Sequence, residues 1–255
     1  MALLGRQKEQ FSNEGYIIVR NLLTQEEVEV IKWRADQIAS GETKHVPEQG
    51  IELELAIEND TVLEKSQVES VCNLSNLVPY DGIMRAHATN PKIVEVIANL
   101  IGPDIKLYGD RLFMKPPHGS SGKKYQQDSQ SWKEVFPHNL VSCWAALDDA
   151  TCENGCRWII PRTHKRGLMG ESQQQDIERK ALLGELELRE VGIEVQPGDC
   201  TFHHSLLLHS HHKNGSPKRC RGYATHYMSA KSKYLGRSTK PNYMLVHGRG
   251  FRGCI

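Results

Sequence analysis

The sequence has almost no net charge and no block of basic residues, with 32 lysines and arginines against 31 acidic residues. Nucleic-acid binding by counterion release needs a basic stripe, so we expect no nucleic-acid partner. No apolar run approaches the roughly 20 residues that cross a bilayer, so we expect no membrane partner. Residues 1–6 become charged too early for a secretory signal. Residues 252–255 fit neither a prenylation nor a peroxisomal tail.

The cysteines also lack a recognisable pairing pattern. There are seven, which is an odd number, and they are scattered along the chain: Cys72, Cys143, Cys152, Cys156, Cys200, Cys220 and Cys254. Without a secretory signal, this predicts reduced thiols and a cytoplasmic location. Cys152 and Cys156 have no second thiol pair at zinc-finger spacing, so we interpret them as turn and strand thiols.

Helix signals concentrate in the first part of the chain. Residues 7–13 form a predicted short helix, and residues 16–19 a β-branched strand. Thr24 and Glu27 make a capping box, which predicts a helix from there to Gly41. Residues 91–101 predict another helix.

Strand signals dominate the later part of the chain, where short apolar or alternating runs are separated by Gly, Pro, Asn and Asp. The predicted strands are residues 105–114, 140–147, 156–160, 186–195, 199–203, 206–209 and 222–227. Helices followed by many strands favour one α+β domain over residues 1–255, with a double-stranded β-helix (jelly roll, cupin-like) flanked by N-terminal helices. We interpret residues 42–80 as loops and short helices, and expect them and residues 168–184 to shape the mouth of a pocket.

One set of residues has the spacing of an iron site. Non-haem iron(II) oxygenases bind the metal through two histidines and one carboxylate, which leaves positions open for a keto-acid and O2. The pattern is His-x-Asp, a distant His, and then an Arg that binds the keto-acid carboxylate. This chain has Gln126-Gln127-Asp128 and, much later, His209.

The order of these motifs resembles the phytanoyl-CoA dioxygenase family. The resemblance lies in residues 11–27, Lys115-Pro116-Pro117, 148–156, 209–214, 226–228, 248–249 and 253–254. It implies an Fe(II)- and 2-oxoglutarate-dependent dioxygenase that hydroxylates a small organic molecule, as a monomer or small homo-oligomer. By this resemblance, Asp128 and His209 are metal ligands and catalytic residues. Lys115 helps hold the keto-acid, and Trp144 lines the pocket.

Two positions depart from the family pattern. Gln126 stands where the first histidine is expected, and an amide oxygen is a weaker donor than imidazole. We interpret Gln126 either as an amide metal ligand or as a polar side chain in a vestigial site. Cys220 stands where the arginine is expected, and its neighbours Arg219 and Arg221 are the candidates for binding the co-substrate carboxylate. Side chains alternate along a strand, so both arginines would point away from the direction of Cys220, unless a bulge or a shift of one residue brings Arg221 back.

Further histidines gather near the motif. His209 and His211 could share one face of a strand. We interpret His203, His204, His211 and His212 as surface residues or as hydrogen-bond partners of the ligands, rather than as replacement ligands. His118 and His138 are expected in loops.

Three functional hypotheses are compatible with this pattern. The first is the active iron oxygenase. The second is a pseudo-oxygenase that serves as a binding module or a metal-free isomerase, because Gln126 and Cys220 replace the expected His and Arg. The third is a site for another metal, such as zinc, formed by Asp128, His209 and a neighbouring histidine.

Overall fold

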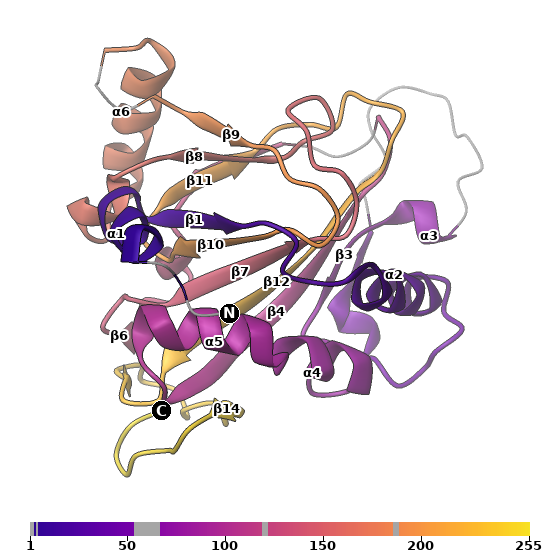
Figure 1. Ribbon diagram of the computed structural model, residues 1–255, viewed down its shortest axis with the longest axis horizontal. Helices are drawn as coiled ribbons and strands as arrows, with labels where there is room; N and C mark the ends of the chain where they lie inside the picture. The colour runs from indigo at the N-terminus through magenta and orange to yellow at the C-terminus, as the bar shows by residue number, and fades with distance from the viewer. Residues whose placement is uncertain (1–2, 4, 54–66, 119–121, 186–188) are drawn as a thin grey trace.

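The protein is represented by a computed structural model that describes residues 3, 5–53, 67–118, 122–185 and 189–255 (Figure 1). The α-helices are α1 Gly5–Glu14, α2 Gln25–Ala39, α3 Gln67–Ser70, α4 Gly82–Ala88, α5 Pro91–Ile101 and α6 Glu171–Leu182. The strands are β1 Tyr16–Val19, β2 Ile51–Leu53, β3 Val71–Ser75, β4 Ile105–Lys115, β5 Lys123–Gln126, β6 Val135–Phe136, β7 Val141–Ala146, β8 Arg157–Ile160, β9 Val191–Ile193, β10 Cys200–His204, β11 Leu208–His211, β12 Cys220–Ser229, β13 Lys233–Tyr234 and β14 Leu245–His247. Short 3-10 turns are η1 Glu48–Gly50, η2 Asp128–Gln130 and η3 Thr163–Arg166.

Two antiparallel sheets form the framework. The large sheet has the order β1-β10-β7-β12-β4-β3-β2, with β14 also paired to β4. The small sheet has the order β5-β11-β8-β9. In Figure 1, α4 and α5 run along the large sheet and α6 stands beside the small one. The predicted α+β double-stranded β-helix is confirmed.

Alternate residues of β12 face two separate cores. Tyr223 and Tyr227 are fully buried in the core between the large sheet and the helices, which also contains Ile93 and Ile97 of α5. Ala224 faces the other way, into the core between the two sheets. The period of two along the strand therefore separates a structural core from the interior that holds the site.

The helix signals of the sequence are largely confirmed. Thr24 accepts a hydrogen bond from the Glu27 backbone, and the Glu27 carboxylate accepts one from the Thr24 backbone, which completes the predicted capping box of α2. α5 begins at Pro91 with Asn90 as its N-cap and packs across β7, β12 and β4. No helix in the described part of the chain is long and apolar enough to span a bilayer.

The region 42–80 differs from its prediction as loops and short helices. β2 and β3 extend the large sheet here, because Asn73, Leu74 and Ser75 pair with residues of β4 and Leu74 is fully buried. Residues 54–66 lie outside the described residues. So do residues 186–188, which belong to the strand predicted at 186–195; only β9 is found in the rest of that range. α4 and β5 were not predicted from the sequence.

Candidate metal centre

Three potential metal ligands meet between the two sheets. Asp128 begins the η2 turn directly after β5, His203 lies on β10 of the large sheet, and His209 lies on β11 of the small sheet. Their donor atoms all lie within 4.8 Å of one another. Two imidazoles and one carboxylate are the donor set that non-haem iron sites use.

His209 is oriented by the backbone just before its strand. Its Nδ1 lies 3.0 Å from the carbonyl oxygen of Leu207, which can only accept a hydrogen bond, so Nδ1 carries the proton. The lone pair is therefore on Nε2, which lies 3.4 Å from Oδ1 of Asp128. A backbone carbonyl on the far nitrogen is a common way to fix the tautomer of a metal-binding histidine.

His203 approaches the carboxylate from the opposite sheet. Its Nε2 lies 3.1 Å from Oδ2 of Asp128. The residue is 1 % exposed. Burial, together with the nearby charge of Arg157, lowers the pKa of His203 to about 3. The ring is therefore neutral at pH 7, which is the form that binds metals.

The orientation of the Asp128 carboxylate is fixed by a hydrogen bond from Ser142. Ser142 Oγ donates a hydrogen bond of 2.8 Å to Oδ2, and the same hydroxyl lies 2.8 Å from Nδ1 of His226. Burial tends to raise the pKa of Asp128, but the neighbouring His209 and His203 outweigh it and hold this pKa well below its ordinary value. The carboxylate is thus ionised and fixed in direction, as a metal ligand requires.

The side chain of Gln127 points away from the site, so that those of its two neighbours point toward it. Its amide is 1 % exposed and points the other way, where it donates to the carbonyls of Gly167 and Leu206 and accepts from the backbone of Met169. Gln126 and Asp128 consequently face a cavity of about 280 Å³ that His209 also lines.

The prediction that the metal site has lost a histidine is therefore not supported, because the described residues still bring two histidines and one carboxylate together. Gln126 does pair directly with His209 across β5 and β11. However, His203 supplies a second imidazole, so the described residues hold a complete His-Asp-His group. From the sequence, His203 was predicted to be a surface residue or a hydrogen-bond partner of the ligands, rather than a ligand. In the sequence, only its place on a strand six residues before His209 pointed to the site. The pairing of β10 with β7, which sets His203 opposite Ser142, directs its side chain to Asp128.

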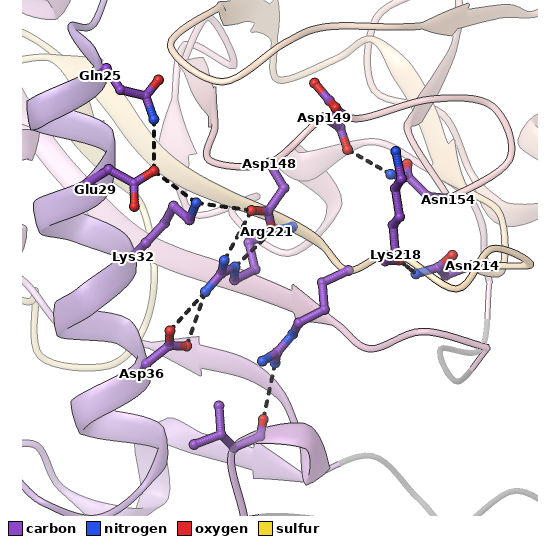
Figure 2. Close-up of polar contacts among 12 residues, drawn as sticks. Gln25, Glu29, Lys32, Asp36, Asp148, Asp149, Asn154, Asn214, Lys218 and Arg221 are labelled. Atoms are coloured by element: carbon purple, nitrogen blue, oxygen red, sulfur yellow. Dashed lines mark hydrogen bonds and ion pairs between the residues drawn. The ribbon is translucent and has the colours of Figure 1, made fainter.

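The arginines beside Cys220 point away from this group, as alternation predicts. Arg221 donates to Asp148 at 2.8 and 3.0 Å and to Asp36 of α2 at 3.1 Å, and Figure 2 shows it between these carboxylates. Arg219 donates to the carbonyl of Val68. The bulge between β12 and β4 falls at His226/Tyr227, too far along to redirect either side chain. Arg221 and Arg219, both predicted to bind the co-substrate, are thus placed elsewhere.

Lys115, Trp144 and Cys220 line a second, narrow cavity next to the first. Cys220 pairs with Lys115 across β12 and β4, so the two side chains share the inner face. Burial lowers the pKa of Lys115 to about 8. Arg157 of β8 lines both cavities and is 7 % exposed. Arg157 was not predicted from the sequence, because nothing near a single arginine at the start of a strand indicates which way its side chain points.

The remaining histidines lie outside the metal-binding group. His211 is buried and lines both cavities; burial, and then the charge of Lys115, hold its pKa well below the ordinary value. His204 packs against His164, and His212 stacks on the Trp158 ring. His118 and His138 fall in connecting segments, as expected. None of the seven cysteines forms a disulfide bond, including Cys152 and Cys156 in their turn.

Comparisons with known proteins agree with this geometry. The model of the family "Phytanoyl-CoA dioxygenase (PhyH)" matches residues 11–222. The peroxisomal phytanoyl-CoA dioxygenase of Rattus norvegicus is 24 % identical over 240 residues, which cover 90 % of this chain and 69 % of the relative. The methylphosphonate hydroxylase of Gimesia maris is 32 % identical over 126 residues, which cover 49 % of this chain and 46 % of the relative.

Solved structures show the same fold at low identity. The iron-bound EctD from S. alaskensis superposes with a TM-score of 0.76 at 17 % identity, covering 93 % of this chain and 82 % of that one. The α-ketoglutarate-dependent carbocyclase SnoK from nogalamycin biosynthesis gives a TM-score of 0.72 at 20 % identity, covering 91 % and 86 %. The family match spans most of the chain and includes the segments that carry Asp128, His203 and His209. The chain therefore belongs to the phytanoyl-CoA dioxygenase family of Fe(II)/2-oxoglutarate oxygenases.

Proposed function

We propose that this protein is an active Fe(II)- and 2-oxoglutarate-dependent dioxygenase that hydroxylates a small organic molecule. The observation that carries the proposal is the meeting of Asp128, His203 and His209 within 4.8 Å. The donor set fits ferrous iron, since one carboxylate and two imidazoles leave coordination positions for other ligands. When bound, iron and 2-oxoglutarate would supply the oxidising chemistry, and the protein supplies orientation.

The residues around the group have distinct tasks. Leu207 and Ser142 direct the ligating atoms of His209 and Asp128. The adjoining cavity of about 280 Å³ is close to the lower end of the usual volume of small-molecule pockets. Tyr108, Phe113 and Trp132 contribute aromatic walls to it. These walls would hold an organic substrate beside the metal and exclude water.

We assign the second imidazole to His203 and give Gln126 a weaker role. Gln126 lines the cavity, whereas His203 does not, because Arg157 lies against the His203 ring: Nη1 of Arg157 is 2.8 Å from His203 Nε2. Ligation through this nitrogen requires the guanidinium to move aside. Imidazole is nonetheless the better ligand for iron(II), so we expect His203 to contribute more to affinity than the Gln126 amide.

Metal affinity of matched variants tests this assignment. We expect His203→Leu and His209→Leu to weaken Fe(II) or Mn(II) binding by at least about 100-fold, because a direct ligand matters more than the residues that orient it. Gln126→Leu should weaken it far less. His212→Ala is the control, since that ring is exposed and stacks on Trp158. Tight metal binding by His203→Leu together with loss in Gln126→Leu would reverse the assignment.

Catalysis itself is tested anaerobically and then in air. Fe(II) and 2-oxoglutarate should give a visible charge-transfer band, and air should then give succinate. Metal analysis of protein purified under reducing conditions separates iron from zinc.

One observation favours the alternative of a metal-free binding module. The Arg157 guanidinium contacts the nitrogen of His203 that would ligate a metal. Failure of the wild-type protein to bind any divalent metal would support this alternative and overturn the oxygenase.

A further inference from the structure

Two buried cations face one another between the sheets, and neither forms an ion pair with a carboxylate of the described residues. Lys115 comes from β4 of the large sheet and Arg157 from β8 of the small sheet, and each is 7 % exposed. Both line the narrow cavity, whose other walls are Phe113, Trp144, Gly155, His211 and Cys220. None of these is acidic, and no described residue forms an ion pair with either cation.

The free-energy cost of burying these two charges is not fully offset within the described structure. A buried charge costs free energy unless an opposite charge compensates it. Among the described residues, Lys115 Nζ donates to the backbone carbonyls of Gly155 and His212. Arg157 donates to the His203 ring, and the charge of Asp128 compensates its own charge in part. Burial accordingly lowers the pKa of Lys115. Two cations that converge on one cavity form a site for an anion.

Metal binding would remove one of the hydrogen-bond acceptors that Arg157 now has. The lone pair of His203 Nε2 now accepts from Arg157, and it becomes unavailable once it ligates a metal. Arg157 then requires a different acceptor. It lines both cavities, so its guanidinium can serve a group that extends from the metal toward Cys220.

We propose that Arg157, assisted by Lys115, binds the distal carboxylate of the 2-oxo dicarboxylic acid co-substrate, in place of an arginine at position 220. This inference rests on the proposed oxygenase function. The guanidinium offers a planar pair of donors to the carboxylate, and the ammonium adds a point charge from the facing sheet.

The surrounding residues suit this arrangement. The cavity now holds only about 10 Å³, which is barely enough for one water, so the carboxylate enters as the two cations turn from their present acceptors toward it. Cys220 leaves that space open, since it is small and lies opposite Lys115. Trp144 forms another wall and packs so tightly on Gly222 that a Cβ at that position would overlap the indole ring.

Binding of two acids to Mn(II)-loaded protein tests the proposal without turnover. 2-Oxoglutarate carries the distal carboxylate, and 2-oxobutyrate lacks it but keeps the metal-chelating end. By titration calorimetry, we expect wild type to prefer 2-oxoglutarate, and to bind it more weakly when metal is absent. Arg157→Leu should weaken 2-oxoglutarate binding by about 10- to 100-fold without weakening the binding of Mn(II) or of 2-oxobutyrate.

Two further variants keep the test decisive. Arg157→Lys retains the charge but loses the planar pair of donors, so it should fall between wild type and Arg157→Leu. Arg219→Met is the matched control, because Arg219 donates to Val68 outside the cavity, and it should bind 2-oxoglutarate as wild type does. Thermal unfolding verifies that each variant is folded.

The outcomes separate this inference from the function on which it rests. If wild type binds neither Mn(II) nor 2-oxoglutarate, the oxygenase proposal fails and the carboxylate site fails with it. If wild type binds both and Arg157→Leu keeps the full preference for 2-oxoglutarate, the carboxylate site alone is overturned. An equal loss in Arg219→Met would also overturn it.

Discussion

Replacing Lys115 by methionine should stabilise the metal-free protein at neutral pH. The pKa of Lys115 falls from 10.5 to about 8 because the ammonium is buried. At about 1.4 kcal/mol per pH unit, a charged Lys115 costs the folded state roughly 3 kcal/mol. Methionine fills similar volume without a charge, but it leaves the carbonyls of Gly155 and His212 without their donor, at about 1 kcal/mol or less each. The expected net gain is about 1–2 kcal/mol.

The pH dependence identifies the cause. Below pH 8, Lys115 is protonated in both the folded and the unfolded chain, so the full cost is present. Between about pH 8 and 10.5 the unfolded chain binds more protons than the folded one, so wild-type stability rises relative to the variant. The advantage of Lys115→Met should therefore shrink across this range and change sign, so that above pH 10.5 the variant is the less stable protein by about 1–2 kcal/mol, the contribution of the lost hydrogen bonds.

Urea denaturation of wild type and Lys115→Met at pH 7, 8, 9 and 10 measures this difference. Subtracting one protein from the other removes the titration of all other groups. A destabilised variant at pH 7, or a difference that stays constant with pH, would refute the reasoning that Lys115 is an uncompensated buried cation. Stabilisation by added 2-oxoglutarate should also be smaller in the variant, since that ligand supplies the missing charge.

Two other contacts lead to separate predictions. Arg221→Met should lower the free energy of unfolding by about 2 kcal/mol, because it leaves the partly buried Asp148 without its main partner and removes the link to Asp36; urea denaturation measures this, and unchanged stability would contradict it. Ser142→Ala should weaken Mn(II) binding about tenfold, because Asp128 loses the hydroxyl that orients it; calorimetry measures this, and an unchanged affinity would show that the hydroxyl does not orient the ligand.

Local sequence patterns were sufficient for much of the framework. The capping box at Thr24 predicted the start of α2, and the strand period predicted the opposite directions of Cys220 and Arg221. These features depend on residues a few positions apart, where backbone geometry determines which side chains meet. The order of motifs likewise indicated the family, with Asp128 and His209 as expected ligands.

The composition of the site was decided by tertiary structure. His203 and Arg157 each lie on a short strand, and nothing near them in sequence indicates what they face. β10 brings His203 to Asp128 because it pairs with β7, and β8 brings Arg157 toward Lys115 because the two sheets pack together. Contacts between separate sheets follow from the packing of the whole chain. The sequence alone therefore identified a family with two altered positions, and the fold placed another imidazole and another arginine beside them.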